Sequence, residues 1–267
     1  MRVLFFGDIV GHVGLTAVSG VLASIKEKLH VDFVIANGEN VSKGKGLLYK
    51  DYAELAQFAD AITLGNHYHS KDAIDGYIKY ADKLVRPLNL LHYEKGEGSR
   101  VFECKGVKIR VTNILAEAFM NEAVKKPIDT LDKLVSDCEE AIHIVDFHGE
   151  SSSEKQIFGF MFDGLVSAVI GTHTHVQTAD ARILEKGTAY MTDVGYCGAY
   201  DTVIGFDKDS VIDKIVYDAG RIYVPTEAPT CVNCLLLDID EKDGSVTYLR
   251  PYYFINGKER NYGESHL

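Results

Sequence analysis

Short apolar runs alternate with stretches of helical periodicity through the first half of the chain. One apolar run ends at Asp8, and leucine, isoleucine and valine then recur at helical spacing from Leu15 to Leu29. Residues 31–36 form the next apolar run. Strands that alternate with helices in this way predict a largely parallel sheet with short connections. The same pattern predicts helices over residues 49–58, 72–80 and 129–141, and strands over residues 60–64 and 144–148.

The last third of the chain has a different pattern, in which strand-like runs follow one another with little helical periodicity between them. The dipeptide Asp243-Gly244 marks a hairpin turn. We therefore expect a second, more antiparallel sheet that packs on the first, within a single domain spanning residues 1–267. The strand-like runs cover residues 188–191, 211–216, 221–224, 231–238 and 246–255.

Several apolar runs end in polar clusters whose residue types bind metal ions. Parallel strands deliver the residues at their carboxyl ends to one common edge of the sheet, so acids, amides and imidazoles are expected to meet there. The clusters are Phe5-Phe6-Gly7-Asp8, Asn37-Gly38-Glu39-Asn40, Gly65-Asn66-His67, Ile144-Val145-Asp146-Phe147-His148 and Gly171-Thr172-His173-Thr174-His175.

These residue types favour a centre of two divalent metal ions. Carboxylate and amide oxygens with imidazole nitrogens, and no thiolate, suit manganese, iron or zinc. The clusters hold more candidate ligands than one catalytic ion can bind while it keeps a position open. Glu39 is a candidate for a carboxylate that bridges two ions, and His67 could stay free as an acid. Asp8 could instead cap the helix that follows it.

The composition is that of a globular protein with a sizeable core, since 46% of the residues are hydrophobic and 25% are charged. The formal net charge of −11 argues against a protein that holds long nucleic acid through many phosphate contacts. An anionic substrate would have to be attracted locally, by bound cations and a few basic side chains. The odd number of cysteines, five, and the lack of a signal peptide or long apolar span lead us to expect a cytoplasmic protein.

Taken in order, the motifs resemble those of the YmdB-type family of bacterial phosphodiesterases, within the calcineurin-like metallophosphoesterases. The resemblance covers nearly the whole chain and implies an α/β (α+β) fold of four layers, an αββα sandwich. Val10 stands where the wider superfamily has a histidine, and Tyr68 where it has a glutamate or aspartate. Both changes are shared by the YmdB-type branch. The motifs are Gly7-Asp8-Ile9-Val10-Gly11, Ala36-Asn37-Gly38-Glu39-Asn40, Thr63-Leu64-Gly65-Asn66-His67, Asp146-Phe147-His148-Gly149-Glu150, Gly171-Thr172-His173-Thr174-His175 and Thr192-Asp193-Val194-Gly195.

The resemblance also implies a set of metal ligands in which Glu39 is shared by both ions. Iron or manganese is the expected metal, with zinc or magnesium as alternatives. One ion would be held by Asp8, Glu39, Asn40 and His175. The other would be held by Glu39, Asn66, His148 and His173.

The activity implied by the resemblance is hydrolysis of small phosphodiesters, particularly 2′,3′-cyclic nucleotides. A hydroxide bridging the two metals would attack phosphorus in line, and His67 would protonate the leaving alkoxide. A phosphomonoesterase on the same metals, or a regulatory RNA- or protein-binding role with incidental turnover, stays open, as does assembly into homo-oligomers. Lys43 and Lys45 could bring charge to a phosphate or belong to a surface loop, and Glu150 could orient a ligand imidazole.

Overall fold

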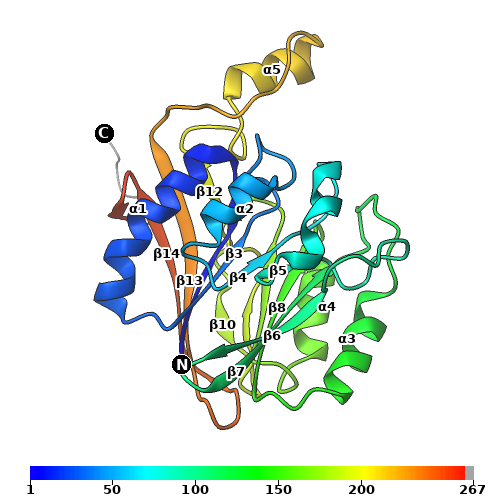
Figure 1. Cartoon of the computed structure of the whole chain (residues 1–267). Helices are drawn as coiled ribbons and strands as arrows, with labels where there is room; N and C mark the ends of the chain where they lie inside the picture. The colour runs from blue at the N-terminus through cyan, green and yellow to red at the C-terminus, as the bar shows by residue number, and fades with distance from the viewer. Residues whose placement is uncertain (262–267) are drawn as a thin grey trace.

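The computed structural model describes residues 1–261, and the last six residues of the expected domain lie outside the described part. The described chain forms two β-sheets with helices on their outer faces (Figure 1). The main path of the first sheet runs through β15 (Lys258–Glu259), β14 (Val246–Ile255), β13 (Thr230–Ile239), β1 (Arg2–Phe6), β3 (Phe33–Asn37), β4 (Ala61–Thr63) and β5 (Leu84–Val85). From β1 to β5 the neighbouring strands are parallel, as the alternation of strands and helices predicts. Two short strands, β2 (Asp8–Ile9) and β12 (Tyr196–Ala199), pair beside this path.

The second sheet comes from the middle of the chain. Its central strands are parallel, and an antiparallel strand closes each edge. The strand order is β10 (Arg182–Ile183), β11 (Ala189–Met191), β9 (Ala168–Thr172), β8 (Ile142–His148), β7 (Val107–Leu115) and β6 (Ser99–Cys104).

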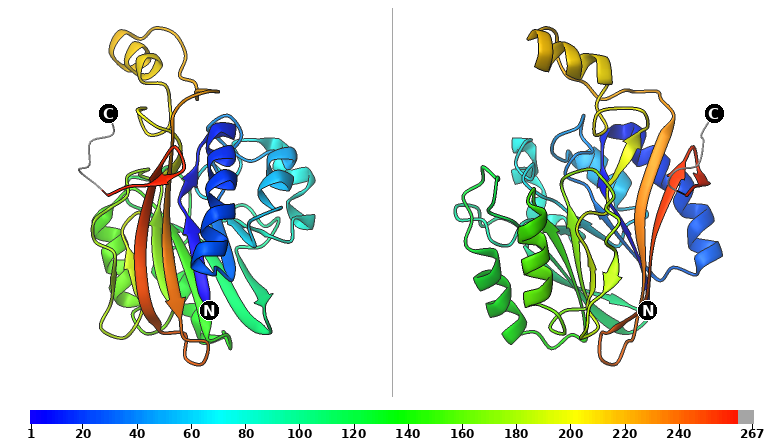
Figure 2. Two further views of the ribbon diagram at one scale, coloured as in Figure 1. Left: turned by 90° about the vertical axis from the view of Figure 1, so that its left-hand side faces the viewer. Right: turned by 180° about the vertical axis from the view of Figure 1, so that it is seen from behind.

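The two sheets and the helices outside them form four layers (Figure 2). Among the described residues, three hydrophobic clusters fill the spaces between these layers. The first cluster lies between the first sheet and two helices, α1 (Gly11–Leu29) and α2 (Tyr49–Leu55). The second lies between the two sheets. The third lies between the second sheet and two further helices, α3 (Pro127–Ser136) and α4 (Ser152–Met161). The predicted αββα arrangement is therefore confirmed.

Alternation of side chains along β1 shows how the layers are held together. Leu4 and Phe6 face α1, whereas Val3 and Phe5 face the second sheet, and all four side chains are fully buried. A strand buried on both faces is a rigid support because its side chains are close-packed on each side. The residues that follow the ends of such strands are therefore held in fixed positions.

The prediction for the last third of the chain was partly wrong. Strands β13 and β14 are antiparallel, as expected, but they extend the first sheet instead of forming the second one. Strand β13 pairs along the whole of β1, whose backbone groups on that side need partners. Two sheets were predicted correctly, and the predicted strand at residues 188–191 joins the second sheet as β11, but β13 and β14 were assigned to the wrong sheet.

Residues 211–216 were predicted as a strand and are part of a helix, α5 (Lys208–Tyr217). The run of valine and isoleucine favours a strand by residue type. The carboxylate of Asp207, however, accepts a hydrogen bond from the backbone N–H of Ser210 at 2.9 Å and caps the first turn of a helix. Residues 221–224, also predicted as a strand, have no regular secondary structure.

Three predicted helices differ from the structure in type or length. Helix α2 ends at Leu55, before the predicted end at residue 58. Residues 72–80 form two short 3₁₀ helices, Asp72–Gly76 and Ile78–Tyr80, in place of one α-helix. Helix α3 begins at a proline in its first turn and ends at Ser136, before the predicted end at residue 141. Among residues 1–261, no helix has both the length and the apolar character needed to cross a membrane.

Candidate metal centre

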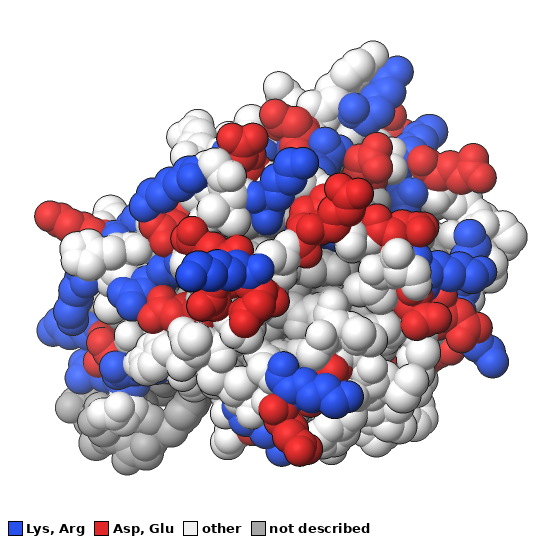
Figure 3. Space-filling view, turned by 90° about the horizontal axis from the view of Figure 1, so that it is seen from below, with Lys and Arg blue, Asp and Glu red and all other residues white. Residues whose placement is uncertain are grey.

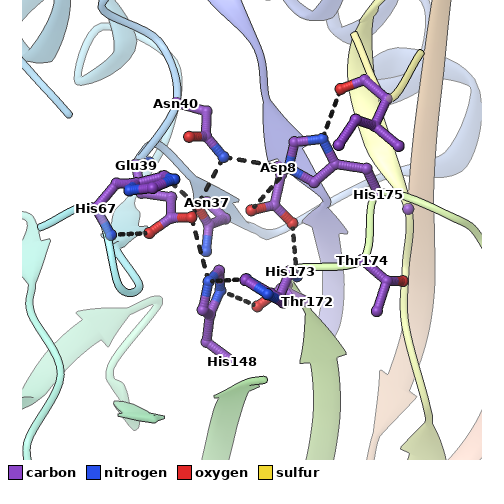
Figure 4. A network of polar contacts seen from close by, with 12 residues as sticks. Asp8, Asn37, Glu39, Asn40, His67, His148, Thr172, His173, Thr174 and His175 are labelled. Atoms are coloured by element: carbon purple, nitrogen blue, oxygen red, sulfur yellow. Dashed lines mark hydrogen bonds and ion pairs between the residues drawn. The ribbon is translucent and has the colours of Figure 1, made fainter. Parts of the chain in front are cut away.

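The polar clusters meet at the edge where the two sheets face each other (Figure 4). Asp8 follows β1, Glu39 follows β3 and Asn66 follows β4, all at the carboxyl ends of parallel strands. His148 is the last residue of β8 and His173 follows β9, at the matching edge of the second sheet. The fold therefore brings together residues that are far apart in the chain, such as Asp8 and His173, which are separated by 165 residues.

Glu39 and His148 join the two sheets at this edge. The Nε2 atom of His148 lies 3.2 Å from Oε1 of Glu39 and 2.9 Å from Oδ1 of Asn66. The same nitrogen lies 3.1 Å from Nδ1 of His173. The ligand atoms of Glu39, His148 and His173 all lie within 4.8 Å of one another, which is close enough for one ion to bind all three.

Asp8 and His175 form the other half of the network. The buried Oδ1 atom of Asp8 has no hydrogen-bond partner and lies 3.7 Å from Nε2 of His175. The side-chain nitrogen of Asn40 lies 3.2 Å from the same imidazole nitrogen and 3.3 Å from Oε1 of Glu39. All the side chains expected as ligands are thus connected through one set of contacts.

The charges of the site depend on one another. Burial disfavours the charged form of each group, but the contact between Glu39 and His148 outweighs it, so the pKa of Glu39 is lowered and the pKa of His148 is raised. Burial raises the pKa of Asp8 and lowers the pKa of His67. The proton on His148 compensates the buried carboxylate, and a cation bound by both groups would replace that proton.

Two acids outside the expected ligand set orient the imidazoles. The hydroxyl of Thr172 donates to Oδ1 of Asp146 at 2.6 Å and can then accept from Nδ1 of His148 at 2.8 Å. This leaves Nε2 of His148 facing Glu39. Glu150 was expected to orient an imidazole, and its Oε2 atom lies 3.2 Å from Nε2 of His173.

The loop that carries His173 and His175 has an unfavourable backbone. His173 has a φ of 103° and His175 a φ of 62°, in the left-handed region that residues with a side chain seldom adopt. Such residues cost about 1 to 3 kcal/mol each and persist only where their surroundings hold them.

A buried ion pair holds this loop in place. Nζ of Lys155 lies 3.0 Å from Oδ2 of Asp193 and donates to the carbonyl of Thr172 at 2.7 Å. The same carboxylate oxygen accepts from the backbone N–H of Thr174 at 2.9 Å. The pair therefore fixes the loop on both sides of His173, and neither side chain is more than 1% exposed.

The site also requires a glycine at position 65. A Cβ atom there would lie 2.4 Å from Oε2 of Glu39 and 2.4 Å from Nε2 of His148. Such contacts are shorter than any real packing distance, so a side chain at Gly65 would displace both groups. Gly65 is what lets the end of β4 approach the centre.

The chemistry of these residues fits divalent cations. The donors are carboxylate and amide oxygens with imidazole nitrogens, a mixture that binds manganese, iron and zinc. The unpaired Oδ1 atom of Asp8 is costly where it is buried, and a cation would satisfy it. A divalent cation is also indicated by the close approach of the ligand atoms of Glu39, His148 and His173.

A pocket of about 720 Å³ opens above these side chains. One side is polar and includes His67, His173 and His175, with Lys43 and Lys45 beside them. The other side is apolar and comes from residues 203–222. His67 donates its backbone N–H to Oε2 of Glu39 at 2.8 Å, so its side chain is positioned at the rim of the pocket.

Except for Glu150, the residues that support the ligands were not assigned this role from the sequence. Asp146 could have been found, because it lies two positions before His148 and alternation puts both on one face of the strand. Lys155 lies at helical spacing with the buried residues Phe158 and Phe162, which places it on the apolar face of α4. Nothing local pairs it with Asp193, which lies 38 residues further along the chain.

Several known proteins are similar to this chain in sequence and in fold. Residues 4–251 match the family model described as YmdB-like protein. A 2′,3′-cyclic-nucleotide 2′-phosphodiesterase from Bacillus subtilis is 40% identical over 245 residues, covering 91% of this chain and 92% of the relative. The crystal structure of a novel phosphatase from Mycoplasma pneumoniae has a TM-score of 0.89 at 35% identity, covering 98% of this chain and 95% of that one. An NAD nucleotidase from Haemophilus influenzae shares the fold, with a TM-score of 0.56 at 14% identity, over 96% of this chain and 56% of that one.

Metal binding should stabilise the folded chain. Manganese at about a hundred times its dissociation constant should raise the melting temperature by about 5 to 10 °C, because a ligand that binds only the folded state stabilises it by mass action. Differential scanning fluorimetry of metal-stripped protein measures this shift. The variant Glu39→Gln should lose most of it, whereas Glu185→Gln, at an exposed glutamate outside the pocket, should keep it. Equal shifts in both variants would exclude Glu39 as a ligand.

Removing the positive charge of the buried Lys155 side chain should loosen the loop of His173 and His175. The variant Lys155→Met should lower the free energy of unfolding by about 3 to 5 kcal/mol, because it leaves the carboxylate of Asp193 buried and unpaired. It should also weaken manganese binding, measured by titration calorimetry. The double variant Lys155→Met with Asp193→Asn should recover part of the stability but not the metal affinity. If Lys155→Met lowered the free energy of unfolding by less than about 1 kcal/mol, as for an exposed ion pair, the ion pair would not hold the loop.

Proposed function

Because the chain belongs to the YmdB-like protein family, we propose that it is a metal-dependent phosphodiesterase acting on small phosphodiesters such as 2′,3′-cyclic nucleotides. The observation that carries the proposal is the meeting of acids, amides and imidazoles at the facing edges of two sheets. The relatives support it, since both the Bacillus subtilis and the Mycoplasma pneumoniae proteins are named for the hydrolysis of phosphate esters.

The proposed centre holds two ions with Glu39 between them. The contacts of Glu39 support the bridging role, because one oxygen faces His148 and Asn40 while the carboxylate lies between the two halves of the network. Bound divalent ions would polarise the phosphate oxygens and lower the pKa of water, which supplies a nucleophile at neutral pH. The first ion would be held by Asp8, Glu39, Asn40 and His175. The second would be held by Glu39, Asn66, His148 and His173.

His67 is the proposed proton donor to the leaving oxygen. It lines the pocket next to the ligands and is linked to the site through the bond from its backbone to Glu39. Burial lowers the pKa of His67 in the ligand-free chain, and the negative charge of a bound phosphodiester would raise it again. Substrate binding and protonation of His67 would therefore favour each other.

Lys43 and Lys45 are the cationic side chains proposed to attract the phosphate. They line the pocket in a loop with left-handed residues at Lys43, Gly44 and Gly46, which turns the chain sharply around the ligands. A local attraction is needed because the net charge of the chain is −11. Over the described residues of the face opposite α5, Lys and Arg side chains are interspersed with Asp and Glu, a pattern unlike the basic stripe that holds long nucleic acid (Figure 3).

A phosphomonoesterase is the second candidate, since the Mycoplasma pneumoniae relative is named a phosphatase. The charge of the pocket favours a diester, because Glu150 lines it and adds a negative charge that disfavours the dianion of a monoester.

Substitution of His67 should separate proton donation from metal binding. The variant His67→Ala should lower kcat for a cyclic nucleotide by about 10² to 10⁴, the usual contribution of a general acid. For bis(p-nitrophenyl) phosphate the loss should be much smaller, because p-nitrophenolate leaves without a proton. Steady-state kinetics and metal analysis of the purified variant measure both effects. Equal losses on the two substrates would remove His67 from this role, and loss of metal would make it a ligand.

A substrate panel should decide between the two activities. With manganese or iron bound, kcat/KM for 2′,3′-cyclic AMP should exceed kcat/KM for 3′-AMP and for p-nitrophenyl phosphate. Phosphate release and chromatography of the products measure the three rates. Faster turnover of the monoesters would show that the centre is a phosphomonoesterase.

A further inference from the structure

Apolar side chains exposed to solvent gather on one side of the pocket. Together they form what we call the apolar wall. Four of them, Val203, Ile204, Ile215 and Ile222, are between 38% and 73% exposed. Exposed apolar residues around a concave site mark a surface that a ligand covers. The wall consists of Val203, Ile204, Phe206, Val211, Ile215 and Ile222.

The wall is attached directly to the candidate metal centre. The carbonyl of Ile204 accepts a hydrogen bond from Nδ1 of His175 at 2.8 Å. The ring of Phe206 lies against the backbone of Gly44, where a Cβ atom would come within 2.6 Å of Cε1. A ligand that touches Ile204 or Phe206 is therefore next to the ligands of the centre and to the loop of Lys43 and Lys45.

Helix α5 supplies the outer part of the wall and has few contacts with the rest of the molecule. It projects from the end of the fold above the two sheets (Figure 1), and Ser210 is its one buried residue. A hydrogen bond from the backbone N–H of Asp207 to the carbonyl of Tyr223, at 3.0 Å, holds the base of this projection together. The apolar side chains of α5 are thus not needed for the core, which leaves Val211 and Ile215 available for a ligand.

We infer that the apolar wall binds the base of a nucleotide whose phosphodiester lies at the candidate metal centre; this inference rests on the proposed function. The histidines and lysines on the polar side of the pocket suit an anion, and the wall suits an apolar group on the same molecule. The pocket volume of about 720 Å³ lies within the range of sites for small organic ligands. The six side chains of the wall carry no hydrogen-bonding group. They therefore contact the apolar surface of a base and do not distinguish the donors and acceptors along its edge.

The test compares two isoleucines of the same helix. Ile215 lines the pocket, whereas Ile212 is also exposed but does not line it. The substrates are 2′,3′-cyclic AMP and methyl riboside 2′,3′-cyclic phosphate, which lacks the base. In Ile215→Ala the ratio of kcat/KM between the nucleotide and the base-free compound should fall about threefold to tenfold, through KM, because part of the apolar contact is lost. Ile212→Ala should leave the ratio unchanged.

Other outcomes would overturn the inference without affecting the proposed function. An unchanged ratio in Ile215→Ala, or an equal fall in Ile212→Ala, would show that the wall does not bind the base. If the wild-type chain turned over neither compound, the proposed function would fail. Calorimetric titration of 3′-AMP would still test the wall in that case. Weaker binding of 3′-AMP in Ile215→Ala alone would support a base site. Equal binding of 3′-AMP by both variants would exclude a base site. A sedimentation coefficient lowered by Ile215→Ala would also exclude it, because the wall would then be a contact between copies of the chain.

Discussion

The buried contact between Glu39 and His148 is the interaction on which the arrangement of the site depends. Each residue comes from a different sheet, and both side chains are almost completely removed from water. A lone charge in such a place would be expelled or neutralised. Because the carboxylate and the imidazole face each other, each compensates the other, and the two sheets can meet without leaving a charge unpaired. The same proximity makes the pair suited to bind a cation in place of the proton.

Around this contact, the fold supplies stability that the site itself lacks. The loop of His173 and His175 is conformationally unfavourable, and Asp8 keeps an unpaired oxygen in the interior. The parallel strands behind these residues are packed on both faces, and the ion pair of Lys155 with Asp193 fixes the loop from below. Strain and unsatisfied groups of this kind are retained where the surrounding structure holds them, and they gather at functional sites.

The two sides of the pocket differ in how they are built. The residues proposed for the chemistry follow strands of the rigid core, so their separations are fixed by backbone pairing. The apolar wall belongs to residues 203–222, whose helix projects from the fold and is mostly exposed. The positions of the side chains are thus fixed most precisely where the reacting groups lie. The part that would touch the rest of a substrate can change without disturbing the core.

The sequence by itself determined which residues gather at the centre. Apolar runs that end in Asp8, Glu39, Asn66 and His148 predict parallel strands, and the parallel strands of one sheet deliver their ends to one edge. That the strand of His148 belongs to a second sheet, whose edge faces the first, was decided by the tertiary structure. The same periodic rules predicted two packed sheets, whereas the four layers were implied by the family resemblance. Only the tertiary structure decided that β13 pairs with β1, that α5 is a helix beside the pocket, and that Lys155 meets Asp193. These depend on contacts between segments far apart in the chain, where burial and unpaired backbone groups outweigh the local preferences that a sequence pattern can show.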